Sequence, residues 1–118
     1  MHVLCLSTEP DLLGKVRIAF SDRIVEIDCR SNLPDFLAAA SGLWDIFVVD
    51  FDEVGNEYSS PLELARKLGP QARILFIGSA KLSEQRRQIE SDGHVLLVKP
   101  LAIGEIGLAL HKLFAKKP

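Results

Sequence analysis

The stretch that decides the fold is residues 44–50, which reads Trp44-Asp45-Ile46-Phe47-Val48-Val49-Asp50. Four consecutive apolar residues run directly into an aspartate. An unbroken apolar run of this length is typical of a parallel strand that helices cover on both faces. The charge at the end of the run predicts that Asp50 lies at the carboxyl edge of a sheet.

Four similar apolar runs lie elsewhere in the chain, at residues 3–6, 24–27, 74–77 and 95–98. Segments with helical spacing of apolar residues follow the five runs, beginning at Pro10, near Leu33, at Pro61, at Leu82 and near Ala102. Repeated β-α order predicts a parallel sheet with right-handed crossovers and helices on both faces. We therefore expect a three-layer α/β fold, a doubly wound (βα)5 sheet of flavodoxin-like order 2-1-3-4-5. A six-stranded dinucleotide-binding layout is disfavoured, because no GxGxxG follows the first run.

Finer helix signals accompany this pattern. Thr8 with Asp11, and Ser60 with Glu63, have the spacing of capping boxes at helix starts. The fourth helix is expected over residues 82–91 and the fifth over about 102–116.

Composition indicates one ordinary globular domain over residues 1–118, with 47% hydrophobic and 25% charged residues. The formal net charge of -2 argues against nucleic acid or an anionic membrane as a partner. No apolar run is long enough to span a membrane and no leader is recognisable, so we expect a cytoplasmic protein. Cys5 and Cys29 are expected to be reduced, although a disulfide could join them if their strands are neighbours.

Two charged residues are candidates for a functional site. In a doubly wound sheet, functional groups gather beyond the carboxyl ends of the strands. Asp50 follows the third run and Lys99 follows the fifth, so we expect them to converge there. A carboxylate can act as a nucleophile toward a phosphoryl group, and a lysine can neutralise the charge of that group. A structural ion pair at the rim of the sheet is the alternative.

Three segments carry a family resemblance: residues 3–13, residues 44–50, and Val95-Leu96-Leu97-Val98-Lys99-Pro100-Leu101. They resemble the first, third and fifth strands of response-regulator receiver domains, which are CheY-like. The resemblance implies that Asp50 is a phosphoacceptor, served by a phosphohistidine of a sensor histidine kinase, and that Lys99 contacts the phosphoryl group. It also implies a cis peptide bond before Pro100.

The metal site of the family is only partly present in this sequence. Receivers carry two acidic residues after the first strand, where this chain has Ser7 and Thr8. Hydroxyls are weak ligands for a hard cation that prefers carboxylates. We expect at most weak Mg²⁺ binding, through Asp50 with Glu9 and Asp52 as doubtful further ligands. Solvated loop charges are the favoured interpretation of Glu9 and Asp52.

The switch residues of the family are also altered. The hydroxyl after the fourth strand aligns with Gly78, and Ser79 is a candidate one place later. The aromatic residue of the fifth strand aligns with Leu96.

These departures favour an atypical receiver, or pseudo-receiver, in two-component phosphorelay signal transduction. It would act through contacts with a sensor histidine kinase or another signalling protein. Homodimerisation or partner docking is expected on the face made by helix 4, strand 5 and helix 5, through an apolar strip that includes Leu96 and Leu108. Phosphoryl transfer to Asp50 would be a half-reaction, so we do not expect an enzyme. The alternative is a small-ligand or nucleotide-binding α/β domain that uses the same crevice.

Overall fold

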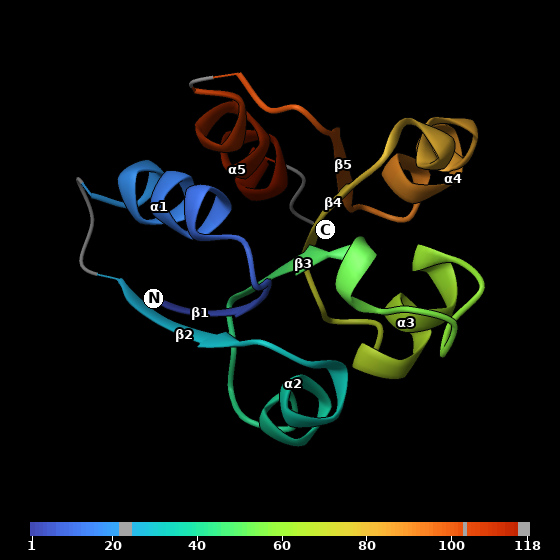
Figure 1. Cartoon of the computed structure of the whole chain (residues 1–118), viewed down its shortest axis with the longest axis horizontal. Coiled ribbons are helices and arrows are strands. Elements are labelled where there is room, and N and C mark those ends of the chain that lie inside the picture. The colour runs from blue at the N-terminus through green and yellow to red at the C-terminus, as the bar shows by residue number, and fades with distance from the viewer. Residues whose placement is uncertain (22–24, 103, 116–118) are drawn as a thin grey trace.

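The computed structural model describes residues 1–21, 25–102 and 104–115. Parallel strands form one sheet in the order β2-β1-β3-β4-β5, as Figure 1 shows. This confirms the predicted fold class and strand order. The strands are β1 (His2–Leu6), β2 (Glu26–Arg30), β3 (Ile46–Asp50), β4 (Ile74–Gly78) and β5 (Val95–Val98).

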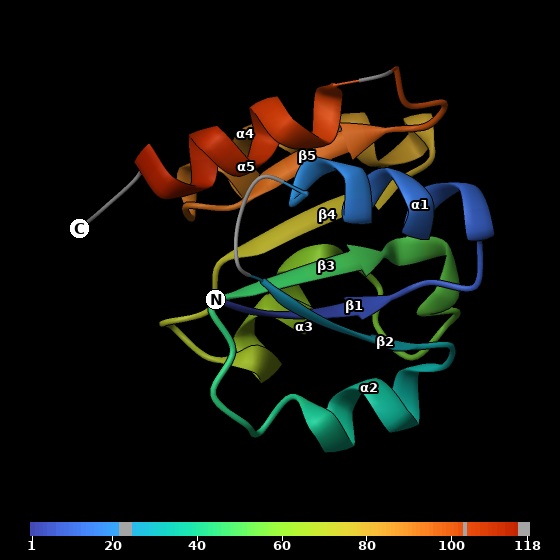
Figure 2. The same ribbon diagram turned by 90° about the vertical axis from the view of Figure 1, so that its left-hand side faces the viewer.

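Helices cover both faces of the sheet (Figure 2). On one face lie α1 (Pro10–Ala19) and α5 (Glu105–Ala115). On the other lie α2 (Leu33–Ala39), α3 (Pro61–Leu68) and α4 (Arg86–Ser91). Two short 3₁₀ helices, η1 (Phe51–Glu53) and η2 (Ala80–Gln85), follow the carboxyl ends of β3 and β4.

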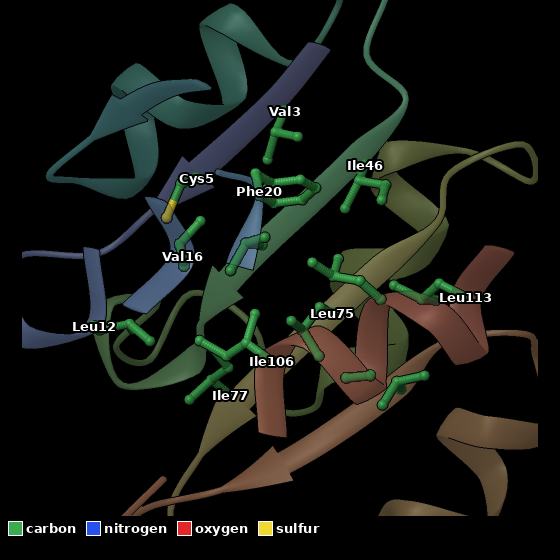
Figure 3. Packing of buried hydrophobic residues seen from close by; sticks show 14 residues of the cluster. Val3, Cys5, Leu12, Val16, Phe20, Ile46, Leu75, Ile77, Ile106 and Leu113 are labelled. Atoms are coloured by element: carbon green, nitrogen blue, oxygen red, sulfur yellow. The ribbon is translucent and has the colours of Figure 1, made fainter. Parts of the chain in front are cut away.

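The core consists of two apolar clusters, one on each side of the sheet. Alternation along β3 places Ile46 and Val48 in the cluster with α1 and α5, and Phe47 and Val49 in the other. Figure 3 shows the first cluster, where residues of α1 and α5 meet those of the central strands. Burial on both faces explains why the strand residues of β3 are continuously apolar up to Asp50.

The second strand is displaced from its predicted position at residues 24–27. It spans Glu26–Arg30 and pairs with β1 along one side, as an edge strand. An edge strand is half-exposed, so its residues alternate between exposed and partly buried and form no apolar run. Residue 24 lies outside the described residues.

The two predicted capping boxes do not form. Glu9 is the N-cap of α1, and the Thr8 hydroxyl donates instead to Glu53 Oε1 at 2.6 Å. At the start of α3, Glu63 accepts hydrogen bonds from the amide and hydroxyl of Ser59, one residue before the predicted cap.

The last two helices differ from the prediction, and residues 103 and 116 of the predicted fifth helix lie outside the described residues. The predicted fourth helix is the 3₁₀ helix η2 followed by α4. Helix α5 begins at Glu105 because Gly104 has a φ of +91°, outside the helical region. None of the described helices is long and apolar enough to cross a membrane.

Candidate functional site

Asp50 and Lys99 meet at the carboxyl edge of the sheet, as predicted. Asp50 is the last residue of β3 and is fully buried. Lys99 directly follows β5, and its Nζ lies 3.0 Å from both carboxylate oxygens of Asp50. The Lys99 amide donates to the carbonyl of Gly78 at 2.8 Å, which ties this loop to the end of β4. The Lys99–Pro100 peptide bond is cis.

Two further carboxylates bind the same ammonium group. Glu9 Oε1 lies 2.8 Å and Asp52 Oδ2 lies 3.0 Å from Lys99 Nζ. Their side chains are half-exposed, at 49% and 52%. The favoured interpretation of Glu9 and Asp52 as solvated loop charges is therefore wrong, because both pair directly with Lys99. An ammonium has three donors, so three carboxylates match its hydrogen-bonding capacity.

Ser7 is an additional member of this cluster. Its hydroxyl donates to Asp50 Oδ2 at 3.3 Å and accepts a hydrogen bond from the Glu9 amide at 3.1 Å. The Asp52 amide donates to Asp50 Oδ1 at 3.2 Å. Each oxygen of the buried Asp50 carboxylate therefore has Lys99 and one neutral donor as partners. The sequence contains the signal for this role of Ser7, because the ends of β1 and β3 are neighbours in the expected sheet.

The electrostatics of the pair follow from burial. Burial raises the pKa of Asp50, and this effect exceeds the lowering by the hydrogen bond and charge of Lys99. Burial alone would lower the pKa of Lys99, but hydrogen bonds to Glu9, Asp50 and Asp52 outweigh it and raise that pKa. Lys99 thus stays charged at neutral pH, and the Asp50 carboxylate depends on it.

No family model and no curated protein matches the sequence. Solved structures do match. A response regulator receiver domain from Clostridium thermocellum has a TM-score of 0.74 at 13% identity, covering 98% of this chain and 94% of that chain. A response regulator receiver protein from Sinorhizobium medicae WSM419 has a TM-score of 0.71 at 18% identity, covering 99% and 97%. The chain has the fold of a response-regulator receiver domain.

A third similar receiver structure shows a modified aspartate. It is a response regulator protein from Burkholderia pseudomallei with a phosphorylated aspartic acid, a calcium ion and citrate. Its TM-score is 0.63 at 25% identity, covering 92% of this chain and 65% of that chain. In that protein, an aspartic acid carries the phosphoryl group and a calcium ion is present.

The carboxylates and hydroxyls around Asp50 are largely engaged with Lys99 or with one another. No three acidic, histidine or cysteine residues in the described part of the chain are grouped as metal ligands. The carboxylates of Asp50, Glu9 and Asp52 all accept hydrogen bonds from the Lys99 ammonium. Ser7 donates its proton to Asp50, and Thr8 donates its proton to Glu53. A cation that needs several free oxygen ligands would have to displace Lys99 first.

Gly78, with which the switch hydroxyl of receivers aligns in the sequence, packs closely against an apolar side chain. A Cβ atom added at Gly78 would overlap Leu82 Cδ1, and Leu82 is buried. Ser79 is the N-cap of η2 without a side-chain cap, and none of the described hydrogen bonds joins its hydroxyl to the site. The structure thus brings together Asp50, Lys99, Glu9 and Asp52, and leaves the switch role of Ser79 a prediction.

The predicted partner face is less apolar than expected. Leu96 is fully buried in the core, while Leu108 on α5 is 68% exposed. A recess of about 150 Å³ between α4, β5 and α5 is lined partly by Arg86, Glu105 and Lys112. The expectation of an exposed strip that includes Leu96 is therefore wrong, because strand β5 is covered on both faces.

A pocket lies beside the candidate site, between the start of α1 and the loop after β5. Its volume is about 370 Å³, and Glu9, Leu12, Lys15 and Lys99 contribute to its walls. The pocket shares Glu9 and Lys99 with the carboxylate cluster.

Proposed function

We propose that residues 1–118 form an atypical receiver domain, a pseudo-receiver, of a cytoplasmic two-component signalling system. It acts through protein contacts, with a sensor histidine kinase or another signalling protein as partner, and it turns over no substrate. The observation that carries the proposal is the binding of the Lys99 ammonium by Asp50, Glu9 and Asp52 together. The receiver fold supports the signalling role.

The charge balance of the cluster argues against efficient phosphorylation. A phosphoryl group is anionic and needs positive charge where it is transferred. Here a single ammonium is shared with Glu9 and Asp52, which compete for it and repel an incoming anion. Asp50 remains the candidate phosphoacceptor, but acceptance would be slow and independent of Mg²⁺.

The glycine at the switch position argues against a conformational response. A modification shifts a two-state equilibrium only by its differential interaction with the two states. Leu82 lies next to Gly78, the residue with which the switch hydroxyl of receivers aligns in the sequence. A phosphoryl group on Asp50 would find no aligned hydroxyl at that position, so its influence would stay local.

Intact-mass measurement after incubation with acetyl phosphate, with and without Mg²⁺, tests this function. We expect little addition of one phosphoryl group, and the same small amount with and without the metal. Asp50→Asn is the control that defines labelling at other residues. Near-complete labelling that requires Mg²⁺ and is lost in Asp50→Asn would show a conventional receiver.

A small-ligand function is the second candidate, and the pocket of about 370 Å³ beside Lys99 favours it. Its walls carry two lysines, Lys15 and Lys99, and two carboxylates, Glu9 and Asp11, which suit a ligand with both an anionic and a cationic group. Thermal shift measurements with a panel of nucleotides and amino acids distinguish the two candidates. A saturable rise in melting temperature that Lys15→Met abolishes would favour the ligand-binding function.

A further inference from the structure

The two cysteines of the chain face each other across neighbouring strands. Cys5 of β1 and Cys29 of β2 are direct partners in the parallel register. Residues paired in this way point to the same face of a sheet, and neighbouring strands are about 4.8 Å apart. That separation is within the range of Cα distances that a disulfide spans. Both thiols are free.

The surroundings of the two sulfurs differ. Cys5 is fully buried in the core beneath α1, and Figure 3 shows it beside Val16. Cys29 lies on the edge strand, is only partly buried, and packs against the margin of the same core. A small oxidant in solvent can therefore approach Cys29 first, while Cys5 is held behind it.

The thiols also differ in acidity. The hydrogen bond from Cys5 and, less strongly, the charge of Arg17 on α1 lower the pKa of Cys29 to about 6, against the opposing effect of burial. The same hydrogen bond and burial raise the pKa of Cys5. Cys29 is thus the thiolate that reacts, and Cys5 keeps its proton.

We propose that Cys5 and Cys29 form a redox site, in which a peroxide-class oxidant converts the pair into an intramolecular disulfide. With hydrogen peroxide, the Cys29 thiolate attacks one oxygen, the O–O bond breaks, and Cys29 becomes a sulfenic acid. The departing hydroxide takes up the proton that Cys29 had released and leaves as the first water. The Cys5 sulfur then attacks the Cys29 sulfur, and the proton of Cys5 leaves with the hydroxyl group as water. Two thiols are oxidised and one peroxide is reduced to two waters.

A metal-binding role does not explain the pair. In the described ranges 1–21, 25–102 and 104–115, no third histidine, cysteine or acidic residue completes a metal site with these cysteines. Two thiolates alone do not fill the four-coordinate site that zinc prefers.

The disulfide would cross-link β1 and β2 close to the residues that support the carboxylate cluster. The Ser7 amide donates to the carbonyl of Arg30 at 3.1 Å, and Arg30 Nη1 donates to the carbonyl of Cys29. A bond between Cys5 and Cys29 would join β2 to β1 two residues before Ser7, whose hydroxyl contacts Asp50. Oxidation would thereby rigidify the strand that supports the site, and a thiol reductant would reverse it.

The test is peroxide treatment of the full chain, followed by alkylation and intact-mass analysis. We expect the loss of two hydrogen atoms and of both alkylatable thiols, restored by dithiothreitol and independent of protein concentration. Cys5→Ala should stop at a sulfenic acid on Cys29 that dimedone traps. Cys29→Ser should leave Cys5 at least about tenfold slower to react, because its thiol is protonated and buried.

Three results would overturn the proposal. They are two thiols still alkylatable after peroxide, a disulfide that forms only between chains, and oxidation of Cys29→Ser as fast as that of the unchanged chain. Circular dichroism of each variant verifies that the fold is retained. The first two results are measured on the unchanged chain, so they do not depend on whether a variant folds.

Discussion

Replacement of Lys99 with methionine removes the ammonium that neutralises the buried Asp50 carboxylate and keeps a long unbranched side chain. Breaking a buried ion pair by removing one partner costs about 3–5 kcal/mol, because a charge is left unpaired in the protein interior. Asp50 would retain the Ser7 hydroxyl and the Asp52 amide as donors. We therefore expect the free energy of unfolding to fall by about 3 kcal/mol at pH 7, at the lower end of that range. The total free energy of unfolding of a domain is about 5–15 kcal/mol.

The loss should depend on pH with a definite sign. Burial already raises the pKa of Asp50, and removal of Lys99 raises it further. A carboxyl group with a raised pKa binds its proton more tightly in the folded state, so stability falls as pH rises through the folded pKa. The deficit of Lys99→Met should be full at pH 7 and should shrink on acidification toward the unfolded aspartate pKa of about 3.9.

Urea unfolding at pH 7 and at mildly acidic pH, followed by Trp44 fluorescence, measures this deficit. Lys67→Met on the exposed side of α3 is the matched control, with an expected change within about 0.5 kcal/mol. The double variant Asp50→Asn with Lys99→Met should recover most of the loss, because a neutral amide needs no counter-ion. A Lys99→Met variant as stable as the control, or a double variant as unstable as Lys99→Met, would refute the reasoning.

Two other predictions concern the switch position and the surface. Gly78→Ser should destabilise the fold by at most about 1 kcal/mol in the same unfolding assay, because its Cβ would overlap only the terminal Cδ1 atom of Leu82, which can rotate away. Leu108→Asp and Arg87→Glu should weaken self-association or partner docking in analytical ultracentrifugation and leave stability unchanged, because both residues are exposed. Association that neither substitution alters would count against this face as an interface.

Much of the fold could be predicted from the sequence because it depends on continuous apolar runs. The runs that became β1, β3, β4 and β5 are buried on both faces, so their composition alone identifies them. Strand β2 has neighbours on one side only, and its alternating residues carry a weaker signal. The burial of Leu96 could not be predicted in the same way. An apolar residue of a strand can be assigned to the core or to the surface only once the position of the covering helix is known.

The candidate site was predictable only as far as strand ends determine position. Asp50 ends β3 and Lys99 directly follows β5, and only β4 lies between these two strands. The meeting of the two side chains at the carboxyl edge therefore follows from the strand order. The pairing of Glu9 and Asp52 with Lys99 depends on the backbone of two loops, which no periodicity encodes. The cysteine pair likewise depends on register, and a shift of one residue between β1 and β2 would separate the two thiols.

The central claim, that Asp50, Glu9 and Asp52 together bind Lys99 and that the site works without Mg²⁺, is tested most directly by an NMR titration with Mg²⁺. We predict no saturable shifts at Glu9, Asp50 or Asp52 in the unchanged chain at physiological magnesium. The variant with Ser7→Asp and Thr8→Asp should gain saturable binding, because it supplies two further carboxylates. The matched variant with Ser7→Asn and Thr8→Asn should not. Saturable binding to the unchanged chain, with shifts centred on Asp50, would contradict the claim.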